Sequence, residues 1–235
     1  MGMGTKSKAE VLRQISEVGV IPIVRAESTE MARRAITAIC KGGVSIIEVT
    51  MTVPNAIRMI EELRGEVGPD TILGAGTVLD ARTARKCLQA GAQFIVSPSL
   101  NVETIAFCNA EGLAILPGAL TPTEIVAAWT AGADFVKVFP AEAMGGASYL
   151  KALKAPLPQI KMVPTGGVSL KTAAAFIEAG AEALGVGSDL VDMSALREGQ
   201  DARITERAQQ FIEIVKQARN SKKSVPASSV SSGGR

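Results

Sequence analysis

The sequence places a lysine in the middle of an apolar run, DFVKVFP, at residues 134–140. If this run is a β-strand, Phe135, Lys137 and Phe139 share one face, and Val136 and Val138 take the other. Burial disfavours the ammonium form and lowers a lysine pKa from about 10.4, by as much as roughly 3–5 units. The resulting neutral amine is a nucleophile for carbonyl groups. The alternative interpretation is a lysine at a strand end whose ammonium group reaches water along its own stem.

A glutamate occupies a similar apolar setting in VSIIEVT, residues 44–50, where Ile46, Glu48 and Thr50 share a face. A buried Glu48 and a buried Lys137 in one core are costly unless they pair with each other or with a ligand. Two interpretations follow: an ion pair that fixes strand register, or a Schiff-base lysine with a carboxylate that moves protons. The chain contains no histidine, so it lacks the usual general base and the commonest transition-metal ligand. We therefore expect chemistry based on Lys, Glu, Arg, hydroxyl and backbone groups, with no metal.

The elements that must position these groups form a repeated pattern. Eight strand-like runs each lead into a helix-like pattern, at residues 20–25, 44–50, 71–77, 93–98, 113–118, 134–140, 160–167 and 183–190. An amphipathic segment at about 6–18 precedes them, and a last helix is predicted over about 203–218. The pattern predicts an α/β protein, a (β/α)8 TIM barrel with an extra N-terminal helix. The alternative is a doubly wound open sheet, but the third glycine of its nucleotide fingerprint is missing from GAGTVL, residues 74–79.

Local signals mark the helix boundaries in this pattern. Helices are predicted over residues 29–41 and 80–90, and Asn101 and Ser169 are predicted N-caps. The run Thr121-Pro-Thr-Glu124 has the form of a capping box with proline at the first helical position. An Ala-Gly-Ala repeat precedes three of the strands, and its glycines suit a helix C′ position with positive φ: Gly91, Gly132 and Gly180.

Composition limits the function classes. The chain has 235 residues, 47% hydrophobic content, a net charge of +2 and only 3% aromatic residues. These values fit one large core and offer no basic, aromatic surface for nucleic acid. Cys40, Cys87 and Cys108 lie among apolar neighbours and are expected to be reduced core residues. We see no signal peptide or membrane span and expect a cytoplasmic protein. One domain over residues 1–219 and a disordered tail over 220–235 are predicted.

In a (β/α)8 barrel, chemistry is found where the strands end, on the C-terminal face. Most strand ends here carry residues that are not typical of a core, among them Arg25, Glu48, Thr77, Pro98 and Lys137. The last two strands end in Thr165-Gly166-Gly167 and Gly187-Ser188. Loops in these positions commonly bind phosphate through backbone N–H groups, and glycine allows the oxyanion to approach closely.

These motifs together resemble a known family. The runs IIEVT (46–50), GAGTV (74–78), FIVSP (94–98), LPG (116–118), VKVFPAE (136–142), PTGGV (164–168) and GVGSDL (185–190) are similar to those of class I 2-keto-3-deoxy-6-phosphogluconate (KDPG) aldolases. That family includes bifunctional forms that also split 4-hydroxy-2-oxoglutarate. The resemblance covers about residues 8–218.

The resemblance implies that Lys137 forms the Schiff base, that Glu48 is the acid/base, and that Thr77 lies near the pyruvate carboxylate. It implies Phe139 and Pro98 as pocket walls. Thr165, Gly166, Gly167 and Ser188 would lie toward the phosphate. No cofactor is implied, because the iminium acts as the electron sink, and the family is typically a homotrimer. One departure is Thr52, where many members carry an arginine that helps to bind carboxylate.

The expected reaction is a retro-aldol cleavage of KDPG to pyruvate and glyceraldehyde 3-phosphate. The alternatives are an aldolase for the C4 epimer, 2-keto-3-deoxy-6-phosphogalactonate, a phosphate-binding barrel isomerase, and a catalytically silent trimeric scaffold. From the residues alone, Arg25 is a candidate to grip one anionic end of the substrate, with a salt bridge to Glu48 or Glu27 as its alternative role.

Overall fold

A computed structural model describes residues 6–224, of which 222–224 are described only as helical backbone. The strands are β1 (Val20–Val24), β2 (Ile46–Thr50), β3 (Ile72–Gly76), β4 (Phe94–Val96), β5 (Ala114–Leu116), β6 (Gly118–Ala119), β7 (Val136–Val138), β8 (Met162–Pro164) and β9 (Leu184–Val186). The helices are α1 (Lys8–Val18), α2 (Thr29–Lys41), α3 (Ala56–Leu63), α4 (Ala81–Ala90), α5 (Val102–Ala110), α6 (Pro122–Thr130), the 3₁₀ turn η1 (Glu142–Met144), α7 (Ala147–Lys154), α8 (Ala173–Glu178), α9 (Met193–Arg197) and α10 (Asp201–Ser224).

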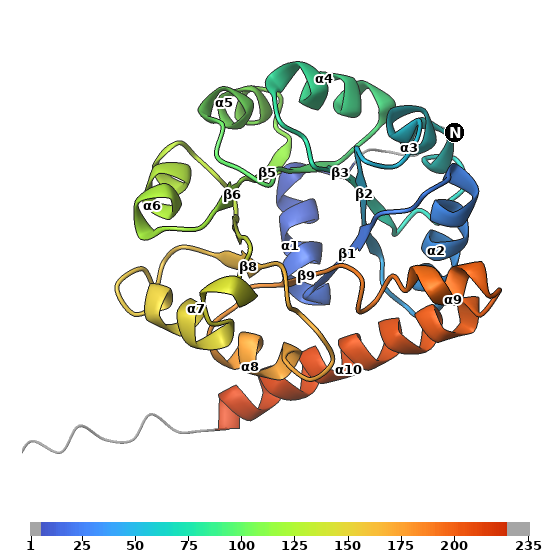
Figure 1. Cartoon of the computed structure of the whole chain (residues 1–235). Coiled ribbons are helices and arrows are strands. Elements are labelled where there is room, and N and C mark those ends of the chain that lie inside the picture. The colour runs from blue at the N-terminus through green and yellow to red at the C-terminus, as the bar shows by residue number, and fades with distance from the viewer. Residues whose placement is uncertain (1–5, 225–235) are drawn as a thin grey trace, which may run out of the picture.

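The fold is α/β, with parallel strands in a strongly curved arrangement and helices around its outside (Figure 1). Six strands pair in the order β5-β4-β3-β2-β1-β9, and β6, β7 and β8 form a second sheet. The two sheets meet at both sides. Residue Pro117 alone separates β5 from β6, and a parallel bridge joins Thr165, just after β8, to Gly185 in β9.

The fifth predicted strand, 113–118, is therefore interrupted. Pro117 has no N–H to donate to a neighbouring strand, although its carbonyl accepts from the Lys137 N–H at 2.9 Å. The ladder breaks at this residue, and β5 and β6 pair with different neighbours, β4 and β7.

Most of the predicted helix signals are confirmed. Asp80 and Asn101 cap α4 and α5, and Thr121 forms the expected capping box with Glu124. The glycines of the Ala-Gly-Ala repeat all have positive φ, between 95° and 102°. The predicted cap at Ser169 is wrong: α8 begins only at Ala173, because Ser169–Thr172 form a separate turn in which the Thr172 hydroxyl accepts from the Ser169 N–H.

The last helix is longer than predicted. The helix α10 spans Asp201–Ser224, so residues 220–224 belong to it and not to a tail. Residues 225–235 of the predicted tail lie outside the described part of the chain. Among residues 6–224, no helix has both the length and the apolar content needed to cross a membrane.

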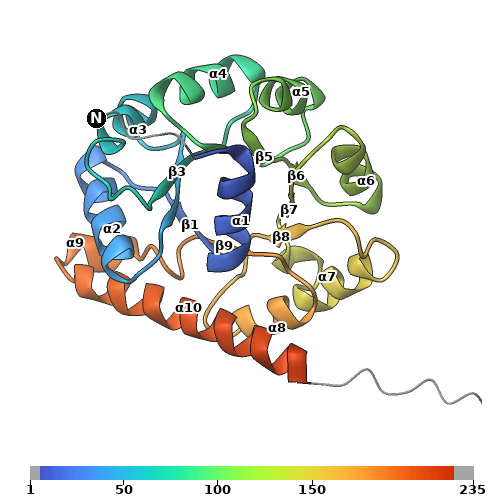
Figure 2. The same ribbon diagram turned by 180° about the vertical axis from the view of Figure 1, so that it is seen from behind.

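Two buried apolar layers result from the alternation along the strands. Side chains on the outer faces, such as Val136 and Val138, pack against the surrounding helices. Those on the inner faces, such as Ile21, Ile46 and Phe135, form a separate inner cluster. Val11 and Ile15 of α1 complete that cluster, and Figure 2 shows α1 lying across the middle of the ring of strands. The inner apolar layer thus lies at the end of the strands nearest α1, which leaves the opposite strand ends for polar groups.

Candidate functional site

Lys137 and Glu48 are the two charged residues buried in the described chain. Lys137 lies in β7 on the same side as Phe135, as the alternation predicts, and is 3% exposed. Glu48 lies in β2, follows Ile46 of the inner cluster, and is 2% exposed. Lys137 therefore does not reach bulk water in the manner of a surface lysine.

Burial shifts both groups toward their neutral forms. Loss of hydration lowers the pKa of Lys137, and the nearby Glu48 only partly opposes this change, while Arg25 adds to it. The same loss of hydration raises the pKa of Glu48, and the charges of Lys137 and Arg25 only partly oppose it. The two shifts agree in direction with a free amine beside a carboxyl that holds its proton more tightly than usual.

The two side chains interact through space without a direct contact. In the described part of the chain, no hydrogen bond or ion pair joins Lys137 to Glu48, and Glu48 Oε1 is a buried oxygen with no hydrogen-bond partner. Lys137 Nζ lies 5.3 Å from the centroid of the Phe139 ring. A register-fixing ion pair would place a lysine proton on that oxygen, so the geometry favours the other interpretation, a Schiff-base lysine with a carboxylate that moves protons.

Glycine at position 76 makes room for the Glu48 carboxylate. A Cβ atom at Gly76 would lie 1.9 Å from Glu48 Oε1 and 2.5 Å from its carboxyl carbon. Register pairs Thr50 with Gly76 and Glu48 with Gly74, so β3 presents its glycines to the side chain of the neighbouring strand. The GAGT segment therefore has a steric role beside Glu48.

A cavity of about 400 Å³ lies at the strand ends. Its wall includes Ile23, which pairs with Glu48, and Phe139, two residues after Lys137, but neither Lys137 nor Glu48 itself. The structure brings seven predicted site residues to its wall: Arg25, Phe139, Thr165, Gly166, Gly167, Gly187 and Ser188. A larger hollow of about 590 Å³ lies outside the strands, between α2 and α10, and contains none of the predicted residues.

The cavity wall offers several donors. Arg25 follows β1 and is exposed. Of its two predicted ion-pair partners, Glu27 pairs with Arg197 instead. No ion pair joins Arg25 to the other, Glu48, within residues 6–224. In the same described region, the backbone N–H groups of Gly166, Gly167 and Ser188 donate no hydrogen bond. Gly166 and Gly167 have φ of 89° and 74°, a left-handed conformation that turns successive N–H groups toward one side. A guanidinium and unpaired N–H groups around one hollow suit an anion.

The other two predicted substrate-binding residues, Thr77 and Pro98, follow β3 and β4 and, like Lys137 and Glu48, are not part of that wall. Thr77 has φ of 59°, which is uncommon for a residue other than glycine and is a feature often found at functional sites. Pro98 is half-buried, and its carbonyl oxygen would lie 2.3 Å from a Cβ at Gly118, so the strand end of β4 approaches β6 closely.

Two carboxylates of the wall, Glu142 and Asp189, were not predicted as site residues. Both lie inside motifs quoted in the sequence analysis, VKVFPAE and GVGSDL. The available signal was a charged residue a few positions after the end of a strand. In residues 6–221, no group of three or more Cys, Asp and Glu side chains is arranged to hold a metal ion. The three cysteines are free, and burial raises the pKa of Cys87 to about 11 and that of Cys108 to about 12.

Comparison with known proteins agrees with this geometry. The family model "KDPG and KHG aldolase" matches residues 11–207. A 2-dehydro-3-deoxy-phosphogluconate aldolase of Treponema pallidum is 36% identical over 205 residues, 87% of this chain and 97% of that protein. A KHG/KDPG aldolase of Escherichia coli is 34% identical over 197 residues, 84% of this chain and 92% of that protein.

A solved structure is similar over the same region. The KDPG aldolase of Legionella pneumophila, captured with pyruvate as a covalent carbinolamine, superposes with a TM-score of 0.77 at 30% identity, covering 85% of this chain and 97% of that one. The sequence match extends from the inner residues of α1 to the first turns of α10 and includes every strand. This chain belongs to the KDPG and KHG aldolase family.

Proposed function

We propose that this protein is a class I aldolase that cleaves KDPG to pyruvate and glyceraldehyde 3-phosphate through a Schiff base on Lys137. The observation that carries the proposal is the buried amine of Lys137, with its lowered pKa and no carboxylate in contact. A neutral lysine amine can attack the C2 ketone of a 2-keto acid, and loss of water then leaves an iminium.

Glu48 is the proposed acid/base. It takes the proton of the C4 hydroxyl as the C3–C4 bond breaks, and the bond's electrons enter the C2–C3 enamine. Glyceraldehyde 3-phosphate leaves, C3 is protonated, and water hydrolyses the iminium to pyruvate and free Lys137. The partnerless Oε1 of Glu48 supports this role, because a buried acceptor is costly unless a ligand or water uses it.

The substrate's two anionic ends have different proposed partners. Phe139, Pro98 and Thr77 surround the pyruvate end, and Thr77 lies near its carboxylate. Gly166, Gly167, Gly187, Ser188 and Thr165 receive the phosphate end. The unpaired N–H groups around the cavity support this assignment.

Arg25 is proposed to hold the phosphate, because it shares the cavity wall with the glycine turns. At the pyruvate end, Thr52 replaces the family's frequent arginine, and its hydroxyl lies 2.7 Å from that of Thr50. Pyruvate recognition in this chain therefore depends on hydroxyl and backbone donors more than on a guanidinium at that position.

The same proposal extends to architecture and assembly. We count β5 and β6 as one strand, so that the bridge between Thr165 and Gly185 closes an eight-stranded (β/α)8 barrel with α1 as an additional helix. Three exposed apolar residues lie on successive segments, and a homotrimer interface would cover them: Leu79 just before α4, Val102 at the start of α5 and Val126 in α6. The three free cysteines fit a reducing, cytoplasmic location.

Two experiments test the proposal. Borohydride reduction in the presence of pyruvate should add the mass of the reduced adduct to the protein, on the peptide that contains Lys137. A coupled assay for pyruvate should then detect cleavage of KDPG, and comparison with 4-hydroxy-2-oxoglutarate and the C4 epimer ranks the substrates. A label on Lys154 or Lys161 would refute the assignment of Lys137. Absence of an adduct would favour an isomerase on the same barrel. Absence of all turnover would favour a catalytically silent scaffold.

A further inference from the structure

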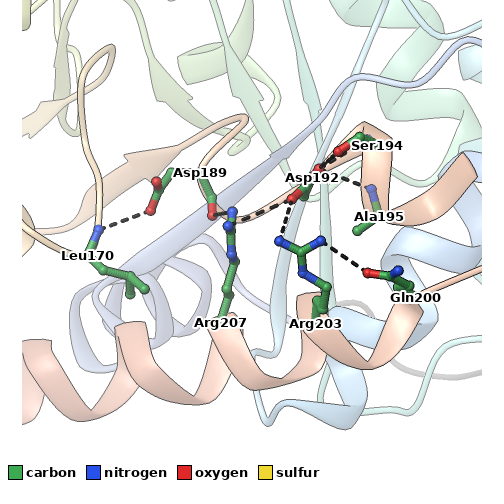
Figure 3. Close-up of polar contacts among 8 residues, drawn as sticks. All are labelled: Leu170, Asp189, Asp192, Ser194, Ala195, Gln200, Arg203 and Arg207. Atoms are coloured by element: carbon green, nitrogen blue, oxygen red, sulfur yellow. Dashed lines mark hydrogen bonds and ion pairs between the residues drawn. The ribbon is translucent and has the colours of Figure 1, made fainter. Parts of the chain in front are cut away.

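The two turns that line the cavity are tied directly to each other. We call residues 166–170, which follow β8, the β8 turn, and residues 187–190, which follow β9, the β9 turn. Asp189 of the β9 turn accepts a hydrogen bond at its Oδ2 from the Leu170 N–H of the β8 turn, at 3.0 Å (Figure 3). Each turn carries N–H groups that face no acceptor within the described residues, so this bond sets the distance between two sets of free donors.

A residue of the last helix holds the β9 turn from outside the barrel. Arg207 of α10 donates through Nη1 to the carbonyl oxygen of Asp189, and its Nη2 lies 3.7 Å from Asp192 Oδ2 (Figure 3). The guanidinium thus joins both ends of the segment 189–192 with one planar group, and its side chain is only 27% exposed. Arg207 does not line the cavity and was not predicted from the sequence.

Asp192, the second residue that Arg207 contacts, is held by hydrogen bonds of its own. Asp192 Oδ1 accepts from the backbone N–H groups of Ala195 and Ser194, at 3.1 and 3.0 Å, and from the Ser194 hydroxyl. The bond from the Ala195 N–H is the main reason why the pKa of Asp192 is lowered, with Ser194 and Arg207 contributing. Asp192 is therefore held at the start of α9 by three hydrogen bonds, and these orient the carboxylate that Arg207 contacts.

Arg203 provides a natural comparison one turn earlier on α10. Its Nη2 also lies 3.7 Å from Asp192 Oδ2, but its other partner is Gln200 and it makes no contact with Asp189. Removing Arg203 therefore perturbs the same carboxylate and the same helix without touching the β9 turn.

We infer that Arg207 and Asp189 are positioning residues for the phosphate end of the substrate. Arg207 holds the β9 turn through its carbonyl, and Asp189 holds the β8 turn through its carboxylate, so the two residues fix how the free N–H groups converge. This inference rests on the proposed function, since it assigns the phosphate to that cavity. It makes the affinity for a phosphorylated substrate depend on a helix that never touches it.

The expected result is a loss specific to one end of the substrate. Arg207→Ala should raise KM for KDPG by about 10-fold or more, as expected when donors to an anion are displaced, and leave kcat within a few fold. The unphosphorylated analogue, 2-keto-3-deoxygluconate, should show an unchanged KM, and the rate of pyruvate trapping on Lys137 should not change. Arg203→Ala is the matched control and should behave as the wild type does.

Conservative variants separate positioning from folding. Asp189→Asn keeps an oxygen that can accept from the Leu170 N–H, so it should recover most of the affinity lost in Asp189→Ala. Arg207→Lys keeps a donor for one partner only and should fall between Arg207→Ala and the wild type, which tests the idea if the alanine variant does not fold. Equal loss for phosphorylated and unphosphorylated substrates, or equal effects of Arg207→Ala and Arg203→Ala, would overturn the inference. Wild-type protein that neither forms the adduct nor cleaves KDPG would instead overturn the proposed function.

Discussion

Adding a single methyl group at Gly76 should disable Glu48 without changing any ionisable residue. An ideal Cβ at this position lies 1.9 Å from Glu48 Oε1, whereas ordinary contacts begin at 3.4 Å. Gly76 does not have positive φ, so alanine fits the backbone, and the conflict falls on the glutamate. With 2% of Glu48 exposed and close packing around it, the carboxylate must retreat by about 1.5 Å along the site.

A displacement of this size is large for proton transfer. Misplacing a catalytic group by about 1 Å can lower the reaction rate about 10²-fold. We therefore expect Gly76→Ala to lower kcat for cleavage about 100-fold. The Schiff base should still form, because Lys137 is not touched. The assays are pyruvate release for turnover, borohydride trapping for the adduct, and thermal unfolding to show that the fold is intact.

A double-mutant cycle decides whether the loss passes through Glu48. In a Glu48→Gln background most of the acid/base contribution is already absent, so adding Gly76→Ala should slow turnover only a few fold further. Unimpaired cleavage by Gly76→Ala would refute the steric reasoning. Full multiplication of the two losses would show that Gly76 acts on something other than Glu48.

Five further outcomes follow from the same site. Lys137→Arg should form no adduct, since a guanidinium stays protonated, and peptide mapping after borohydride checks this. Lys137→Met should be inactive yet no less stable in denaturant titration, because an apolar residue replaces a buried ionisable one that makes no ion pair within the described residues; a less stable variant contradicts this. Burial lowers the pKa of Lys137, so between the folded and unfolded pKa values the folded protein binds fewer protons, and the stability contributed by this group rises with pH. The rate of pyruvate trapping should also rise with pH and reach half its maximum below 10.5, the ordinary lysine pKa. A midpoint at 10.5 or above would exclude a desolvated amine. Glu48→Gln should trap pyruvate but turn over at least about 10²-fold more slowly. Arg25→Ala should weaken the binding of KDPG about 10–100-fold and leave pyruvate trapping unchanged. Equal loss for KDPG and pyruvate would instead place Arg25 on the carboxylate.

Strand alternation made much of this site predictable from the sequence. Because side chains alternate every second residue, Phe135 and Lys137 had to share a face, and so did Ile46 and Glu48. The structure places Phe135 and Ile46 in one inner cluster, which directs Lys137 and Glu48 into the same interior. Helix caps were equally local, since Thr121 and Glu124 satisfy each other within one turn.

Contacts between distant residues were not predictable in this way. The choice of Arg197 as partner of Glu27 depends on how α9 lies beside the end of β1, which no short-range pattern encodes. The contact of Arg207 with Asp189 likewise depends on how α10 lies beside the segment that follows β9. Short helices such as α9, with five residues, have too few turns for a clear periodic signal.

The position of the two buried charges shows how the fold tolerates them. Lys137 and Glu48 each reduce stability through lost hydration, and within the described chain no hydrogen bond or ion pair joins them to offset that loss. The fold is stabilised instead by its two buried apolar layers. One is the inner cluster closed by α1, and the other is the continuous layer between the strands and the outer helices. Separating the apolar layers from the polar strand ends lowers the pKa of the Lys137 amine without exposing the core to water. In the proposed mechanism, the same desolvation that makes Lys137 costly to the fold also favours the amine form that attacks a ketone, so the two properties cannot be improved independently.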